Sequence, residues 1–135
     1  MVKQIFINLP VKDLDKSISF YEKIGFTVNP QFTDSTAACM VWSETIFVML
    51  LTYDKFSQFI NKEIMDGKNA VSVINSLSLG SKDEVAQMME KVVAAGGNEH
   101  VEAKDYGFMI QRSFEDLDGH NWEVFYMDMT QMPTE

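Results

Sequence analysis

The sequence lacks most of what a disulfide-bonded, nucleic-acid-binding or membrane-spanning protein needs. Its single cysteine, Cys39, excludes an internal disulfide and fits a reducing compartment such as the cytoplasm. Eleven lysine and arginine residues stand against twenty aspartate and glutamate residues, and this net charge of −9 disfavours nucleic acid and anionic membrane surfaces as partners. No apolar run approaches the roughly 20 residues of a membrane helix, and the first residues lack a signal-peptide pattern. We therefore expect a cytoplasmic protein that binds neither nucleic acid nor membrane.

Apolar residues, by contrast, are plentiful enough for a folded domain. They make up 46% of the 135 residues, which predicts a single domain over residues 1–135 with a substantial core. Ten methionines and ten phenylalanines indicate soft, adaptable apolar surface, although most of these side chains are expected in the core.

The first half of the chain shows one helical pattern among several extended ones. Asp13 is a candidate N-cap for a helix with Leu14, Ile18 and Tyr21 on one face, and Gly25 is expected to end it. Alternating polar and apolar residues predict a strand at 4–9, and further strands are predicted at 26–28, 37–42 and 46–51.

The second half repeats this order. Ser81 and Glu84 form a capping-box pair that opens a helix, and Gly96-Gly97 is expected to end it. The strands of this half are predicted at 76–79, 98–103, 108–114 and 122–127. The chain is thus interpreted as an α+β fold of two β-α-β-β-β modules, at about 1–52 and 76–130. The connector, at about 53–75, contains a helical pattern over 53–65 and has the length of a lid or binding loop.

One carboxylate, Glu123, interrupts the last apolar run. It follows a tight turn at Asp118-Gly119, where glycine tolerates positive φ. Burying a charge is costly unless the group is paired, protonated or bound to a cation. Three readings stay open: a solvated face, an ion pair with Arg112 on the neighbouring strand, or a site in which Glu123 serves as general acid or base.

Four segments carry a resemblance to a known family, together with the repeated element order. They are 11–17, 20–26, 94–97 and 114–123. In these the chain resembles the vicinal oxygen chelate superfamily, which includes glyoxalase I, bleomycin-resistance proteins and extradiol dioxygenases, and it looks most like bacterial proteins described as predicted lactoylglutathione lyases. The resemblance implies two curled sheets around a shared cavity with the helices outside, and a homodimer.

Metal-dependent members of that superfamily carry His, Gln or Glu at four strand positions facing the cavity. The resemblance places these positions at Phe6, near Leu50, near Ile74 and at Glu123. Three of the four are apolar, and one carboxylate cannot hold a divalent cation. We therefore expect no metal and no cofactor.

The resemblance also implies which side chains line the cavity, which we expect to be largely apolar. Glu123 is the candidate catalytic residue, and His100 is expected to be solvated beside Glu99 and Glu102. The candidate ligand-binding residues are Phe6, Asn8, Met40, Trp42, Leu50, Tyr106, Phe108, Arg112 and Phe125. For the aromatic residues and methionines among them, ordinary core packing is the competing interpretation.

Three functions stay open at this point. The first is a metal-independent lyase-type enzyme in which Glu123 moves a proton. The second is a protein that sequesters a small organic molecule without chemistry, as bleomycin-resistance proteins do. The third, ranked behind these two, is a metal-dependent lactoylglutathione lyase or dioxygenase.

Overall fold

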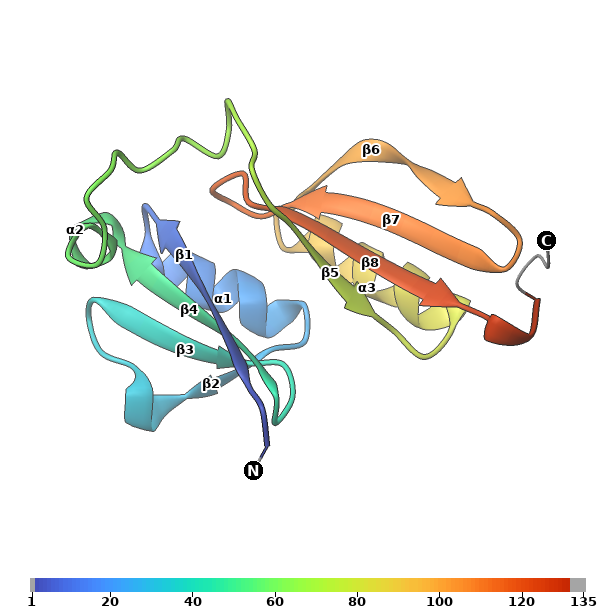
Figure 1. Ribbon diagram of the computed structural model, residues 1–135, viewed down its shortest axis with the longest axis horizontal. Coiled ribbons are helices and arrows are strands. Elements are labelled where there is room, and N and C mark those ends of the chain that lie inside the picture. Colours follow the sequence, from blue (N-terminus) through green and yellow to red (C-terminus); the bar gives the residue numbers. More distant parts are fainter. Residues whose placement is uncertain (1, 132–135) are drawn as a thin grey trace. The chain divides into compact units, whose positions relative to one another are not determined.

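Each half of the chain folds as a compact unit in the computed structural model, which describes residues 2–131 (Figure 1). The two units comprise residues 1–66 and 67–135. Each holds a four-stranded mixed sheet and one long helix, so the predicted α+β fold of two modules is confirmed. Over the described part of the chain, no helix has both the length and the apolar character needed to cross a bilayer.

The sheet of the first unit, sheet A, pairs its first strand with its last. The elements are β1 (Ile5–Val11), α1 (Leu14–Lys23), β2 (Thr27–Asn29), η1 (Pro30–Phe32), β3 (Ala37–Val41), β4 (Ile46–Thr52) and α2 (Tyr53–Ser57). The strand order is β1-β4-β3-β2, with β1 and β4 parallel and the other pairs antiparallel. Helix α1 begins as predicted, because the Asp13 carboxylate accepts the Lys16 N–H at 3.1 Å.

The sheet of the second unit, sheet B, has the same topology. The elements are β5 (Ile74–Ser78), α3 (Lys82–Ala94), β6 (Asn98–Asp105), β7 (Met109–Glu115), β8 (Asn121–Met127) and η2 (Met129–Gln131). The strand order is β5-β8-β7-β6, with β5 and β8 parallel. The N-cap of α3 is the predicted Ser81, whose hydroxyl accepts the Glu84 N–H at 3.1 Å.

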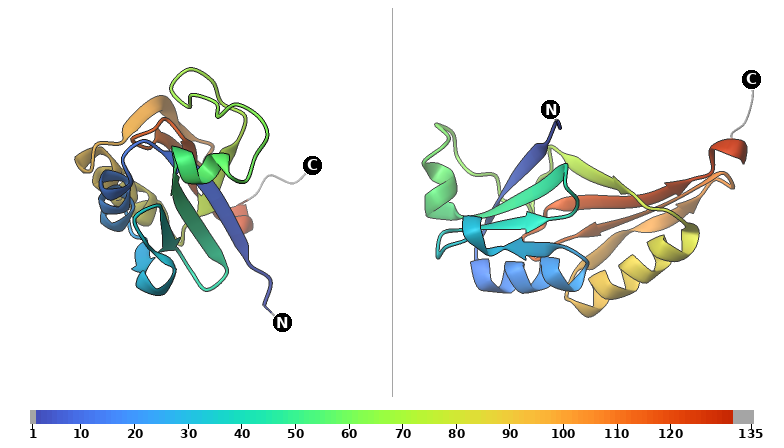
Figure 2. Two further views of the ribbon diagram at one scale, coloured as in Figure 1. Left: turned by 90° about the vertical axis from the view of Figure 1, so that its left-hand side faces the viewer. Right: turned by 90° about the horizontal axis from the view of Figure 1, so that it is seen from below.

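In each unit the long helix lies against one face of its own sheet (Figure 2). Strand residues alternate between the two faces, so every second side chain is buried under the helix. Under α1 the fully buried strand residues are Val11, Ala38, Met40, Val48 and Leu50. Under α3 they are Phe114, Trp122 and Val124. The opposite face of each sheet, called the open face below, carries the remaining strand side chains and is not covered by α1 or α3.

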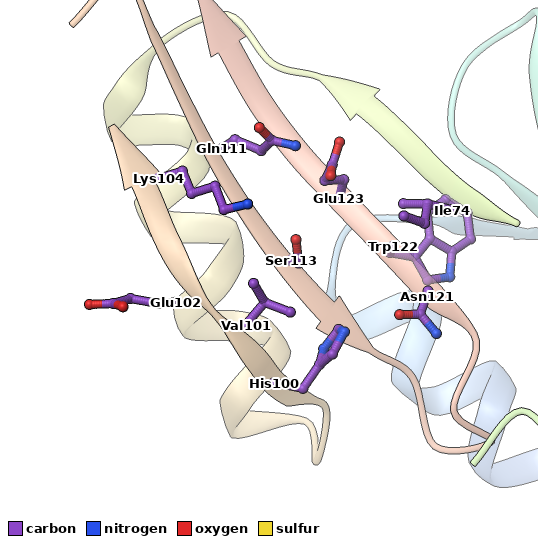
Figure 3. Close-up of a pocket in the computed structure, with 10 residues that line it drawn as sticks. All are labelled: Ile74, His100, Val101, Glu102, Lys104, Gln111, Ser113, Asn121, Trp122 and Glu123. Carbon is purple, nitrogen blue, oxygen red and sulfur yellow. The ribbon is translucent and has the colours of Figure 1, made fainter. Parts of the chain in front are cut away.

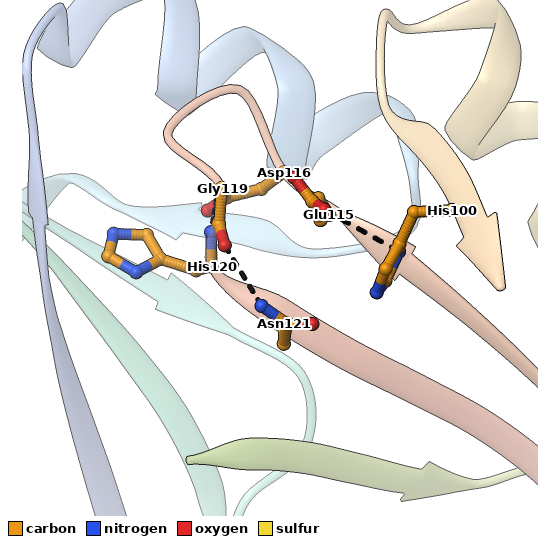
Figure 4. Close-up of polar contacts among 6 residues, drawn as sticks. All are labelled: His100, Glu115, Asp116, Gly119, His120 and Asn121. Atoms are coloured by element: carbon orange, nitrogen blue, oxygen red, sulfur yellow. Dashed lines mark hydrogen bonds and ion pairs between the residues drawn. The ribbon is translucent and has the colours of Figure 1, made fainter. Parts of the chain in front are cut away.

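The turn between β7 and β8 is a closed hairpin, as the Asp118-Gly119 pattern predicts. The Asp116 carboxylate accepts the N–H groups of Asp118 and His120 at 3.0 and 2.8 Å, and Gly119 adopts a φ of +84° (Figure 4). The main chain of Gly67 lies directly against this turn. Because β8 starts at Asn121, the hairpin sets the position at which the final strand enters sheet B.

The connector is less helical than predicted. Only Tyr53–Ser57 forms a helix, although the apolar pattern extends to Met65. Phe59 and Met65 are 69% and 45% exposed, and a short helix without a packed apolar face is marginal in water. Strand β5 also begins at Ile74, two residues before its predicted start.

Candidate functional site

Glu123 lies on the open face of sheet B. Its neighbours in β8, Trp122 and Val124, are buried under α3, so the alternation of the strand directs Glu123 to the other side. Ser76 stands opposite it on β5, and the Ser76 hydroxyl donates a hydrogen bond to Glu123 Oε1 at 2.9 Å. Among the described residues this is the one hydrogen bond that the carboxylate makes. Its second oxygen is therefore available to a ligand.

A pocket of about 240 Å³ surrounds Glu123 on this face (Figure 3). Ile74, Val101 and Trp122 contribute apolar surface to it. The polar side chains that line it are His100, Glu102, Lys104, Gln111, Ser113, Asn121 and Glu123. Seven of the ten lining residues are thus polar or charged, whereas the sequence predicts a largely apolar cavity; the lining surface itself is divided about evenly between polar and apolar atoms.

The register of sheet B explains why these polar groups meet. Ser113 on β7 stands opposite Glu123, and Gln111 on β7 stands opposite Lys104 on β6. Residues paired across strands place their side chains on the same face. The polar positions of three strands therefore coincide on the open face.

Arg112 lies on the other face of sheet B. It stands opposite Val124, and its Nε and Nη2 atoms donate to the two carboxylate oxygens of Glu99 at 2.8 and 2.7 Å. These hydrogen bonds lower the pKa of Glu99 and raise the pKa of Arg112. Of the readings left open for Glu123, the ion pair with Arg112 is therefore wrong, because the two side chains point to opposite sides of the sheet.

His100 lies at the end of the pocket next to the β7–β8 turn. Its Nδ1 atom is 3.9 Å from Glu115 Oε1, and the two side chains are 23% and 22% exposed (Figure 4). The predicted neighbour Glu99 binds Arg112 instead. His100 thus forms part of the pocket wall next to an acidic partner.

On sheet A, two of the predicted ligand-binding residues share the open face. Phe6 pairs with Phe47, and their rings stack with centroids 4.5 Å apart and an interplanar angle of 9°. Asn8 is the next residue on this face and stands opposite Met49. Phe6 is 48% exposed, so the ring stack is accessible to solvent.

The other candidates on sheet A pack in the core. Leu50 and Met40 are fully buried under α1 rather than beside Phe6, and the open-face position next to Leu50 is Met49. The predicted alignment of β4 is thus shifted by one residue, which exchanges the two faces. Trp42 packs against Phe26, with ring centroids 5.0 Å apart.

The remaining aromatic candidates fall in two places. Phe125 stands opposite Gln111, on the same face as Glu123 and the pocket. Tyr106 and Phe108 flank Gly107 in the β6–β7 hairpin, which is closed by a hydrogen bond from the Tyr106 N–H to the Met109 carbonyl at 2.8 Å. Tyr106 is 53% exposed, so it does not cover the core.

The residues present do not fit the metal centre that the superfamily resemblance implies. Phe6 and Met49 on sheet A offer no oxygen or nitrogen ligand, and on sheet B the oxygen donors next to each other are Glu123 and Ser76. Within residues 2–131, no group of three or more His, Cys, Asp or Glu side chains is placed to hold a metal ion. A metal-free site remains a prediction.

Several pocket residues escaped the sequence analysis. Ser113 and Gln111 lie one and three residues before Phe114, so the two-residue period of a strand could have assigned them to the face opposite Phe114. Ser76 and Lys104 carry no comparable signal, because their proximity to the site depends on which strands pair.

Comparisons with known proteins agree with this fold. Residues 3–43 match the family model of the bleomycin resistance protein-like N-terminal domain. A hypothetical protein from S. aureus is 29% identical with a TM-score of 0.78, over 93% of this chain and 95% of that chain. A glyoxalase-related enzyme from Fulvimarina pelagi is 24% identical with a TM-score of 0.76, over 93% and 88% of the two chains. A bleomycin-binding protein, solved in complex with bleomycin, is 19% identical with a TM-score of 0.62, over 93% and 98%.

No match is found among curated proteins. The family model and the similar structures confirm the resemblance to the glyoxalase, bleomycin-resistance and dioxygenase group, which is the vicinal oxygen chelate superfamily.

Proposed function

We propose that this chain, which has the fold of the glyoxalase, bleomycin-resistance and dioxygenase superfamily, binds a small organic molecule at the pocket around Glu123. The observation that carries the proposal is the Glu123 carboxylate, which accepts one hydrogen bond from Ser76 and keeps its second oxygen free. A concave site with a few positioned polar groups is typical of small-molecule recognition. A protein of the same fold that binds bleomycin supports this reading.

Binding without chemistry is the first candidate, and metal-independent lyase-type catalysis is the second. The second is favoured by the contact between Glu123 and the Ser76 hydroxyl at 2.9 Å. A carboxylate held by one donor, with its other oxygen exposed to a ligand, is arranged to accept or return a proton. In both cases Glu123 is the central residue, and turnover of a bound compound would separate the two.

A binding experiment with matched variants tests the proposal. Thermal shift and isothermal titration would use bleomycin and a library of small-molecule fragments with the wild-type chain, Glu123→Gln and Glu22→Gln. Glu22 is exposed on α1 and serves as the matched carboxylate control. A ligand that stabilises the wild type and Glu22→Gln but binds at least tenfold more weakly to Glu123→Gln supports the site. Equal binding by all three proteins, or binding of no compound, would refute it.

A second copy of the chain is the proposed protein partner, since the superfamily resemblance implies a homodimer. The edge strand β5 supports this proposal, because Ile74 and the preceding Val73 are 58% and 61% exposed. Light scattering during size-exclusion chromatography measures the mass directly. A monomeric mass across the micromolar range would refute the dimer.

A further inference from the structure

The pocket on sheet B contains polar side chains that the fold itself does not use. Among the described residues, the side chains of Lys104, Gln111 and Ser113 make no hydrogen bond or ion pair with the protein. Glu123 uses one carboxylate oxygen and leaves the other free. Uncommitted polar groups that converge on one pocket are what a polar ligand requires.

The two opposite charges of the pocket stand apart from each other. Lys104 on β6 is opposite Gln111, and Glu123 on β8 is opposite Ser113, two residues further along β7. Neighbouring strands lie about 4.8 Å apart and residues rise about 3.4 Å each, so the main chains of Lys104 and Glu123 are roughly 12 Å apart on a diagonal. Figure 3 shows the Lys104 ammonium group directed over β7, towards the space between the two charges.

The other charged side chains of the pocket do not neutralise the charges of Lys104 and Glu123. Figure 3 shows Glu102 directed away from the centre of the pocket. His100 lies beside Glu115 at the turn end of sheet B. The centre of the pocket therefore has one cationic pole at Lys104 and one anionic pole at Glu123, with the neutral Gln111 and Ser113 between them.

We propose that the ligand of this pocket is dipolar, with a cationic group bound by Glu123 and an anionic group bound by Lys104. The inference rests on the proposed function and adds the chemical class of the ligand. The cationic group is an ammonium or amidinium, which donates to the free oxygen of Glu123. The anionic group is a carboxylate or phosphate, and the atoms between the two charges face Gln111 and Ser113. A ligand with only one charge leaves the other pole of the pocket without a partner.

A series of linear probes tests this class directly. The dipolar probes are β-alanine, 4-aminobutyrate, 5-aminopentanoate and 6-aminohexanoate, each compared with the alkylamine and the carboxylate of equal chain length. Dissociation constants would come from titrations followed by ¹⁵N–¹H spectra, with shifts expected at Glu123 and Lys104. At least one dipolar probe is expected to bind about tenfold more tightly than both of its singly charged counterparts. If no dipolar probe exceeds its amine and its acid, the inference is refuted.

Three variants assign the poles. Lys104→Gln is expected to remove the preference for the dipolar probe over the amine while leaving the affinity for the amine unchanged. Glu123→Gln is expected to remove the preference over the acid. The double charge exchange Lys104→Glu with Glu123→Lys is expected to restore binding of the dipolar probe, because a linear probe can bind in reverse. Unchanged affinity in Lys104→Gln would refute the inference.

The same experiments separate this inference from the proposed function. If bleomycin or a library fragment binds in a Glu123-dependent way while all dipolar probes bind no better than their amines, the pocket is a ligand site and the dipolar class is wrong. If no compound of any kind binds, the proposed function itself fails.

Discussion

Replacing Gly119 by alanine should destabilise the second unit by more than its backbone conformation alone requires. Gly119 has a φ of +84°, and a Cβ atom added there would lie 2.6 Å from the carbonyl carbon and oxygen of Gly67 and 2.8 Å from the Lys68 nitrogen. All three are main-chain atoms, so no side chain can rotate to relieve the overlap. Gly107 offers a matched control, because it also has a φ of +84° but no atom lies within 4 Å of an added Cβ.

The expected magnitudes follow from these two positions. Gly107→Ala introduces left-handed strain of about 1–2 kcal/mol, partly offset by about 0.4–1 kcal/mol from the stiffer unfolded chain. The net cost is about 1 kcal/mol. Gly119→Ala carries the same terms plus the overlap with Gly67, and overpacking of this kind typically costs about 1–3 kcal/mol. The total for Gly119→Ala is therefore about 2–4 kcal/mol.

Urea unfolding followed by fluorescence and circular dichroism measures both variants. A third variant, Gly67→Ala, places its Cβ 2.8 Å from the Asp118 carbonyl oxygen, with no positive φ at Gly67. It should cost about 1–3 kcal/mol from overlap alone. Equal midpoints for Gly119→Ala and Gly107→Ala, at unchanged slope, would refute the close approach of the Gly67 main chain to the turn.

Three further predictions concern the two faces and the core. Leu50→Ala should lower the free energy of unfolding by about 2–5 kcal/mol, and Met49→Ala should lower it clearly less, because Leu50 is fully buried under α1 and Met49 lies on the open face. Urea unfolding measures both variants, and similar losses of stability would contradict the assigned register. Arg112→Met removes the hydrogen bonds to Glu99 and should lower the free energy of unfolding at pH 7 by about 1.5 kcal/mol in the same assay. Because Arg112 lowers the pKa of Glu99, this contribution is present in full above pH 4.5 and is lost as the pH falls through the lowered pKa of Glu99. A stability difference between Arg112→Met and wild type that grows on acidification would contradict the pair. The Cys39 thiol, whose pKa is raised by burial, should react with Ellman's reagent only as fast as the protein opens, and rapid labelling at pH 8 would contradict its placement.

Local signals were sufficient to predict the starts of the two long helices and the turn before the last strand. Asp13 and Ser81 cap the two long helices as expected, since each capping side chain needs only a main-chain N–H three residues ahead. The Asp118-Gly119 pattern likewise specifies its turn within five residues. These interactions are short in sequence, and so the sequence alone displays them.

The site was predicted less well, because it depends on contacts between distant segments. Arg112 was grouped with Glu123, yet an offset of one residue between β7 and β8 places it under α3 with Glu99. A similar offset moved Leu50 from the open face to the core. Which strand residues share a face depends on the register of the sheet. That register is set by pairing between strands that are distant in the sequence, so the pattern of a single strand does not reveal it.

The pairing of the first and last strands within each sheet also bears on synthesis of the chain. The first sheet can close once Thr52 has been made, whereas β5 must wait until β8 has emerged, because Ser76 and Glu123 pair across an intervening helix and hairpin. During that interval the apolar faces of α3 and β7 have no completed sheet to bury them. The second unit is therefore the part of a nascent chain most exposed to aggregation or to chaperone capture.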